Sequence, residues 1–288
     1  MNVQVPDAPI SSRRSLPGAA TLATLIRRHP LGAFFTLAYG ISWLMLLALY
    51  GLLRLPAALV ILLQTLGPTL AALVTLSAQE GSAGRRRLLG RIRIWRVSRR
   101  WYLFALVVIP VICLATALVL PGAFVGLGGQ SVVKLVIEFL AVVVVGFLSG
   151  PLFEEPGWRG FALPRLQVQM GALRGTLLLG VLWAAWHLPQ FLVPEWADEN
   201  GGLSPTLVIT FLLMVVAIAP IMTWLYNSTR GSLLLVMLAH SAINAALSVF
   251  VVSASALDVG VLGFGALSVG LVLITRGRLG YVPSEDLG

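Results

Sequence analysis

The chain has 288 residues, of which 58% are hydrophobic and 11% are charged, and its mean hydropathy is +0.93. Soluble domains carry about 25% charged residues, so this composition excludes an ordinary soluble protein and indicates a polytopic membrane protein. The formal net charge is +9, but the basic residues fall almost entirely in short connections between apolar runs. That distribution is typical of membrane proteins and argues against nucleic-acid binding.

Eight apolar runs are long enough to cross a membrane, since a spanning helix needs roughly 20 residues at a rise of about 1.5 Å each. We therefore expect an all-α polytopic membrane protein with about eight transmembrane helices. The last run is short and rich in glycine, which makes it the weakest candidate for a full span. The expected spans are 31–53, 57–78, 101–120, 134–154, 174–192, 206–226, 232–252 and 257–274.

The connections between these runs alternate in charge. The amino-terminal arm, the links at 82–100 and 227–231, the link after the fourth run and the tail are basic, whereas 121–132 and 253–256 are uncharged and 193–205 is acidic. Because positive links face the cytoplasm, we expect both termini to be cytoplasmic in a multi-pass protein of the plasma (inner) membrane. The basic link and tail residues are Arg85, Arg86, Arg87, Arg91, Arg93, Arg96, Arg99, Arg100, Arg159, Arg165, Arg174, Arg230, Arg276 and Arg278.

The simplest partition of the chain is one membrane domain with short flanking segments. Residues 1–30 contain four arginines and no clear small-residue cleavage site, so we expect a cytoplasmic arm rather than a removable signal. Residues 31–275 form the transmembrane domain, and 276–288 form a cytoplasmic tail. The stretch 85–100 interleaves arginines with apolar residues and Trp95. It is either an amphipathic helix on the cytoplasmic leaflet, held by anionic lipid, or a loop that sets topology.

The stretch 149–160 places two adjacent carboxylates, Glu154 and Glu155, at the end of an apolar run. Charge this close to hydrocarbon costs several kcal/mol unless it is paired or hydrated. Glu155 and Arg159 have the i, i+4 spacing of a helical ion pair, which leaves Glu154 free to face a cavity. Pro156 disfavours helical geometry at the preceding residue. The alternative is that both carboxylates lie in a cytoplasmic link beside Arg159.

Two later apolar runs each contain one histidine, His187 and His240. Asn244 follows His240 by four residues and Trp183 precedes His187 by four, so each pair shares a helix face. A lone histidine in a bundle more often forms an interhelical hydrogen bond than a catalytic site, but this combination predicts one intramembrane site. With these boundaries His187 lies about 20 Å and His240 about 12 Å from the cytoplasmic ends of their runs, whereas Glu154 is nearly at the end of its run.

A common site therefore needs one of three adjustments. The fourth helix continues past Glu154, the fifth helix begins late, or a water-filled funnel opens to the cytoplasm.

Three motifs occur in order on successive runs: Glu-Glu-x-x-x-Arg at 154–159, Trp-x-x-x-His at 183–187 and His-x-x-x-Asn at 240–244. Together they resemble the CPBP family, the CAAX-processing and bacteriocin-processing intramembrane proteases, also called the Abi or type II CAAX endopeptidase family. The resemblance covers roughly residues 134–254. Trp183 stands where the family usually has phenylalanine.

The resemblance implies an intramembrane endopeptidase that cuts a membrane-associated or lipidated protein or peptide. It implies that Glu154 activates water with His187 beside it, and that His240 and Asn244 polarise the scissile carbonyl and stabilise the oxyanion. Glu155 and Arg159 would hold the helix end, with Trp183 in support. No cofactor is assigned. Glu154, His187 and His240 could instead bind zinc, but the chain contains no His-Glu-x-x-His motif and Asn244 is a poor zinc ligand, so we favour a metal-independent mechanism.

Two other functions remain open at this point. A proton-coupled transporter also uses intramembrane Glu and His residues, but it predicts internal repeats with broken helices in both halves, and none is found in the sequence. A non-catalytic membrane scaffold or immunity protein could keep the same fold. The intact set of Glu154, His187, His240 and Asn244 argues against the scaffold.

Overall fold

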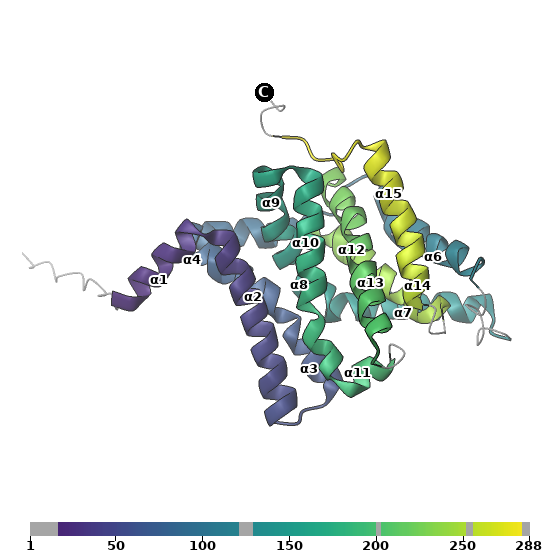
Figure 1. The fold of residues 1–288 in the computed structure, drawn as a ribbon. Helices are drawn as coiled ribbons and strands as arrows, with labels where there is room; N and C mark the ends of the chain where they lie inside the picture. Colours follow the sequence, from purple (N-terminus) through teal and green to yellow (C-terminus); the bar gives the residue numbers. More distant parts are fainter. Residues whose placement is uncertain (1–16, 121–128, 200–202, 252–255, 284–288) are drawn as a thin grey trace, which may run out of the picture.

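The computed structural model describes residues 17–120, 129–199, 203–251 and 256–283 (Figure 1). These residues form helices joined by turns, with no strand among them, and eight of the helices are long and apolar enough to cross a membrane. The predicted all-α fold with eight spans is therefore confirmed, including the glycine-rich last one. The spans are Pro30–Leu52, Ala57–Arg93, Arg99–Ala117, Val132–Ser149, Ala172–Leu192, Pro205–Ser228, Leu233–Phe250 and Ala256–Ile274.

Several spans are built from more than one helical element. Short π-helical or 3-10 turns join α-helices at Leu47–Leu52, Phe104–Val108, Pro156–Ala162, Leu188–Leu192 and Gly260–Phe264. The α-helices are α1 (Pro17–Arg28), α2 (Pro30–Leu46), α3 (Ala57–Gln64), α4 (Leu66–Gly90), α5 (Arg99–Leu103), α6 (Ile109–Ala117), α7 (Val132–Ser149), α8 (Pro151–Glu155), α9 (Leu163–Met170), α10 (Ala172–Trp186), α11 (Pro194–Glu199), α12 (Pro205–Ser228), α13 (Leu233–Phe250), α14 (Ala256–Val259) and α15 (Gly265–Ile274).

Serine residues cap the first turn of three spanning helices. The hydroxyls of Ser131, Ser204 and Ser232 each accept a hydrogen bond from the backbone N–H three residues later, at the starts of α7, α12 and α13. Such caps satisfy a backbone donor that the helix itself leaves unpaired. The sequence therefore encodes the starting points of these helices as well as their apolar character.

The helices that carry the motif residues lie at the centre of the bundle. In α13, 72% of the most apolar window is buried, and the values for the spans containing α10 and α12 are 50% and 56%. The span containing α7 is only 11% buried and lies at the periphery. α10 packs along α12, and α13 packs along α7. The two histidines are thus on well-buried helices that other protein elements surround.

The basic links gather at one end of the bundle, where α9 and the carboxy-terminal segment also lie (Figure 1). Arg27 Nε donates to the carbonyl of Ala78 at 2.7 Å, and Ser232 Oγ donates to the carbonyl of Ile94 at 2.6 Å. Arg230 also bonds the backbone of the 85–100 stretch. The links that are not basic return the chain at the opposite end, near α3 and α11. This arrangement is the one that the alternation of charge predicts, and the cytoplasmic location of the basic end stays a prediction.

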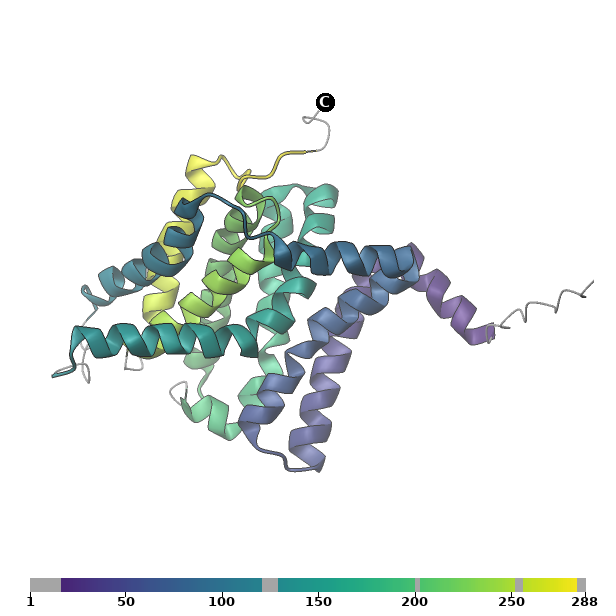
Figure 2. The same ribbon diagram turned by 180° about the vertical axis from the view of Figure 1, so that it is seen from behind.

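The basic stretch 85–100 is partly helical. α4 turns sharply at Gly81, whose φ of 63° suits glycine, and Figure 2 shows its two arms meeting at an angle. The second arm runs to Gly90, followed by the 3-10 turn Arg91–Arg93 and a non-helical segment until α5. Trp95 in that segment is 58% exposed. The stretch therefore combines a short surface helix with a loop. Residues 1–16, 121–128, 200–202, 253–255 and 284–288, on which parts of the predicted arm, links and tail fall, lie outside the described residues.

The fourth predicted span, 134–154, is wrong at its carboxy-terminal end. α7 stops at Ser149, Gly150 and Pro151 break the helix, and the chain continues through α8, a π-helical turn at Pro156–Ala162 and α9. All seven residues of that turn are buried. The sequence instead predicts a cytoplasmic link here. Glu155 keeps helical backbone angles in front of Pro156, because the wider turn accommodates the proline.

Hydroxyl groups from the second span support the break. Thr69 Oγ1 donates to the carbonyl of Phe153 at 2.5 Å, and Thr65 Oγ1 donates to the carbonyl of Ser149 at 3.3 Å. Backbone carbonyls that lose their helical partners inside a membrane protein need such donors. The carboxylates of α8 are therefore held inside the bundle by specific contacts with the second span.

Candidate active site

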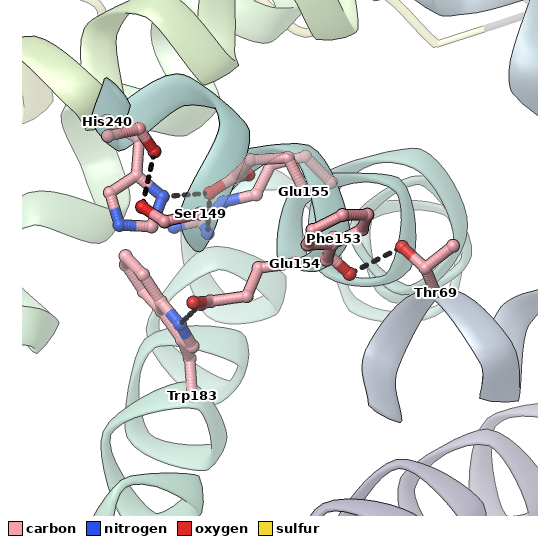
Figure 3. Close-up of polar contacts among 9 residues, drawn as sticks. Thr69, Ser149, Phe153, Glu154, Glu155, Trp183 and His240 are labelled. Carbon is pink, nitrogen blue, oxygen red and sulfur yellow. Dashed lines mark hydrogen bonds and ion pairs between the residues drawn. The ribbon is translucent and has the colours of Figure 1, made fainter. Parts of the chain in front are cut away.

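Glu154 is a buried carboxylate that faces a cavity. Its side chain is 5% exposed, and its Oε2 accepts a hydrogen bond from Trp183 Nε1 at 3.0 Å (Figure 3). Its Oε1 lies over Gly150, where an added Cβ would be only 2.9 Å away. One oxygen is therefore fixed by the indole, and the glycine leaves room for the other.

Glu155 points away from this cavity and joins two other groups. Its Oε1 accepts from Arg159 Nη1 at 3.0 Å and lies 2.8 Å from His240 Nδ1 (Figure 3). Glu155 and Arg159 are 0% exposed. The Arg159 guanidinium also stacks on the Trp183 ring at 3.9 Å. The interpretation that the two carboxylates lie in a solvated cytoplasmic link is therefore wrong.

The hydrogen-bond partners fix which imidazole nitrogens carry hydrogen. His240 Nδ1 faces a carboxylate, and His187 Nδ1 lies 2.8 Å from the backbone carbonyl of Trp183. Both partners only accept, so both Nδ1 atoms are donors. In each ring Nε2 is the nitrogen left for substrate, water or a metal.

The four residues predicted to be catalytic, Glu154, His187, His240 and Asn244, line one cavity of about 920 Å³. Glu154 and His240 are buried, His187 is half-buried and Asn244 is exposed to the cavity. The His187 ring packs edge-on against Trp186 and Phe211, with ring centroids 4.8 and 5.2 Å apart. Aromatic walls with a few converging polar groups are typical of a substrate chamber.

The depth of Glu154 follows from the break after α7. Trp183, one helical turn before His187, is the residue that bonds Glu154. The carboxylate is thus level with the middle of α10 rather than at a membrane surface. Of the three adjustments that the sequence leaves open, the helical chain continues past Glu154.

The zinc alternative requires Glu154, His187 and His240 to form a close ligand group. Within the described residues, no three His, Cys, Asp or Glu side chains are grouped closely enough to hold a metal ion. The Nε2 atoms of the two histidines and the free oxygen of Glu154 are the atoms that could bind one.

Residues 136–246 match the sequence family described as "Type II CAAX prenyl endopeptidase Rce1-like". This part of the chain belongs to that CPBP-type family. The CAAX prenyl protease 2 of Methanococcus maripaludis is 31% identical over 108 residues, which make up 37% of this chain and 40% of that protein. The chain thus matches less than half the length of this curated relative. The matched region contains all seven candidate site residues.

Within this family region, Trp183 has a larger role than its ring shape predicts. Its indole N–H is the donor to Glu154, which the phenylalanine more usual in the resemblance could not supply. The sequence also did not identify Gly150, Thr69 or the contact between Glu155 and His240. A glycine followed by a proline just before two carboxylates is the signal that could have indicated the first of these.

Proposed function

We propose that the protein is an intramembrane endopeptidase that hydrolyses a peptide bond of a membrane-associated or lipidated protein or peptide. The observation that carries the proposal is the convergence of Glu154, both imidazoles and Asn244 on one cavity, in a segment of the Rce1-like family. We place the protease core at about 134–254 in a single transmembrane domain, 31–275, of the plasma (inner) membrane. Its partners are membrane lipids and the substrate chain.

Glu154 is the general base in the proposed reaction. A water beside its free oxygen gives a proton to the carboxylate while the water oxygen attacks the scissile carbonyl carbon. The hydrogen bond from Trp183 Nε1 to Oε2 fixes the direction of the carboxylate. Positioning of this kind is a major source of rate, because the reacting groups no longer have to find each other.

His240 and Asn244 stabilise the oxyanion that forms. They lie one helical turn apart on α13, and both line the cavity. Oriented donors at a developing oxyanion are worth about 3–4 kcal/mol each. His240 donates through Nε2 when its ring carries both protons, and the Glu155 carboxylate at Nδ1 stabilises that imidazolium. The amide of Asn244 donates in any protonation state.

Collapse of the intermediate completes the reaction. The protonated Glu154 gives its proton to the leaving nitrogen, the C–N bond breaks, and the products are a carboxylate and an amine. His187 lies in the same cavity and orients the attacking water through its Nε2. We favour this route without a metal, because the donor set around Glu154 can account for each proton transfer.

The test is the Glu154→Gln variant in the full-length protein. Membranes from cells with the wild-type protein or with the variant are compared by mass spectrometry of new peptide termini. A protease predicts termini that disappear in Glu154→Gln while expression stays normal. Glu138→Gln is the matched control, since Glu138 is an exposed glutamate of α7 far from the cavity lining. Identical termini in all three membranes, with an unchanged cellular phenotype, would favour the scaffold instead.

A further inference from the structure

The cavity that contains Glu154 extends toward one end of the bundle. Its lining includes Ala57 at the start of α3, Trp196 and Asp198 of α11, and Ala256 at the start of α14. These residues lie where the chain reverses at the end opposite the basic links. Figure 1 shows α3 and α11 at the bottom and α9 with the carboxy-terminal segment at the top.

Exposed polar residues mark that end as the mouth of the chamber. Glu195 and Asp198 line the cavity and are exposed. The Tyr50 hydroxyl donates to Glu195 Oε2 at 2.7 Å and thereby ties the end of the first span to α11. This hydrogen bond lowers the pKa of the Glu195 carboxyl, so the group is ionised at neutral pH. Among the described residues, no basic side chain lines the cavity.

The other end of the chamber is filled with side chains. Beyond Glu154 the turn Pro156–Ala162 is wholly buried. Phe34 packs against Trp158 and Phe161, with ring centroids 5.6 and 4.9 Å apart. In the described part of the chain, no residue of the basic links belongs to the lining. The chamber is therefore closed toward the basic end.

The charge of the two ends determines which side of the membrane each faces. Arg54 and Lys134 are the basic residues near the mouth among those the structure describes, and Lys134 is paired with Glu138 at 3.5 Å. The remaining lysines and arginines of the described spans and links lie at the other end, apart from the buried Arg159. An excess of Lys and Arg in short links orients that end to the cytoplasm.

We propose that the chamber opens on the non-cytoplasmic side of the membrane. Its substrate is then a polypeptide segment that reaches the site from that side, and the carboxylates at the mouth favour a segment with basic rather than acidic residues. A cytoplasmic prenylated tail would have to approach from the closed end. The identity of the occupant as a substrate rests on the proposed function, whereas the direction of the opening does not.

The experiment measures the side from which single cysteines react with a membrane-impermeant maleimide. The native Cys113, which is buried, is first replaced in the full chain by Cys113→Ala. Asp198→Cys then reports the mouth, Ser248→Cys the cavity wall and Arg86→Cys the basic end; all three positions are exposed. Labelling of each variant in detergent and a single gel-filtration peak show that the protein is folded and the thiol is reactive.

The expected result is labelling of Asp198→Cys and Ser248→Cys in right-side-out vesicles and of Arg86→Cys only in inside-out vesicles. Labelling of Ser248→Cys from the cytoplasmic side, or of Asp198→Cys and Arg86→Cys from the same side, would overturn the proposal. Green fluorescent protein fused after Gly288 tests orientation without any substitution. A fluorescent fusion is expected, and a dark fusion with an active alkaline phosphatase fusion at the same point contradicts the orientation.

Failure of this inference can be told apart from failure of the proposed function. Adding Glu154→Gln to the single-cysteine proteins abolishes proteolysis but leaves the labelling pattern unchanged. A chamber open to the cytoplasm with cleavage intact overturns only the sidedness. Absence of cleavage with the expected labelling overturns only the protease.

Discussion

His240 Nδ1 lies 2.8 Å from Glu155 Oε1, and the same oxygen accepts a hydrogen bond from Arg159 Nη1 at 3.0 Å. The second carboxylate of the pair therefore holds the imidazole, and the first remains free for the cavity. A carboxylate that orients a histidine through Nδ1 also fixes its tautomer. Two adjacent residues of the same type thus have different environments because they point to different sides of α8.

Glu155→Gln is expected to destabilise the protein, whereas Glu154→Gln is not. Removing one partner of a buried ion pair leaves the other charge uncompensated and costs about 3–5 kcal/mol, and Arg159 is wholly buried. Thermal unfolding in detergent should show a clearly lower midpoint for Glu155→Gln and a midpoint near wild type for Glu154→Gln. Both variants should lose cleavage.

Glu138→Gln is the control for the loss of a glutamate charge. Its pair with Lys134 is exposed, and exposed pairs contribute about 0–1 kcal/mol. Equal midpoints for Glu155→Gln and Glu138→Gln would show that Glu155 does not compensate the buried guanidinium.

Trp183→Phe should reduce cleavage without unfolding the protein. Phenylalanine keeps an aromatic ring between Arg159 and His240 but removes the N–H that bonds Glu154. Hydrogen bonds to charged groups contribute about 1.5–3 kcal/mol, so kcat/KM should fall by roughly 10- to 100-fold. Steady-state cleavage of a peptide found by the terminus comparison would measure this.

Trp186→Phe is the matched variant. Trp186 is a neighbouring buried tryptophan of α10 whose Nε1 has no hydrogen-bond partner. It should keep most of its activity, since no hydrogen bond is lost. Similar activity in Trp183→Phe and Trp186→Phe would mean that Glu154 does not depend on the indole donor.

The sequence predicts the eight spans and the grouping of the basic links because long apolar runs and charged links have simple physical consequences in a bilayer. It also selects the residues that line the cavity, since an intramembrane Glu, His or Asn is costly without a partner. The path of the chain after Ser149 could not be predicted in the same way. It depends on hydroxyl donors from Thr65 and Thr69, more than eighty residues earlier.

The contact between Glu155 and His240 has the same origin. Local spacing along a helix relates Glu155 to Arg159, but no local rule relates it to a histidine 85 positions away. The carboxylate could therefore be assigned its arginine from sequence and not its imidazole. Prediction failed where a side chain has partners on two different helices.

Gly150→Ala should impair catalysis more than stability. Gly150 has ordinary helical backbone angles, so alanine is allowed, but its Cβ would come within 2.9 Å of Glu154 Oε1 and displace the free oxygen. Cleavage should fall while the unfolding midpoint changes little. Gly146→Ala one turn earlier is the control, because no heavy atom lies within 4 Å of a Cβ there. If Gly150→Ala and Gly146→Ala cleave at equal rates, the space over Gly150 is not needed by the carboxylate.

Exhaustive chelation should leave cleavage by the purified protein intact. The proposed reaction assigns each proton transfer to Glu154 and oxyanion stabilisation to His240 and Asn244, so it needs no Lewis acid. The assay compares rates before and after dialysis against a strong chelator, with a zinc protease in the same buffer as the control that must lose activity. Complete loss that is restored by zinc would instead assign Glu154, His187 and His240 to a metal, with both Nε2 atoms as ligands. In that case Asn244→Ala should lower the rate without changing the amount of zinc bound, because a carboxamide one turn beyond His240 would act on substrate rather than on the metal.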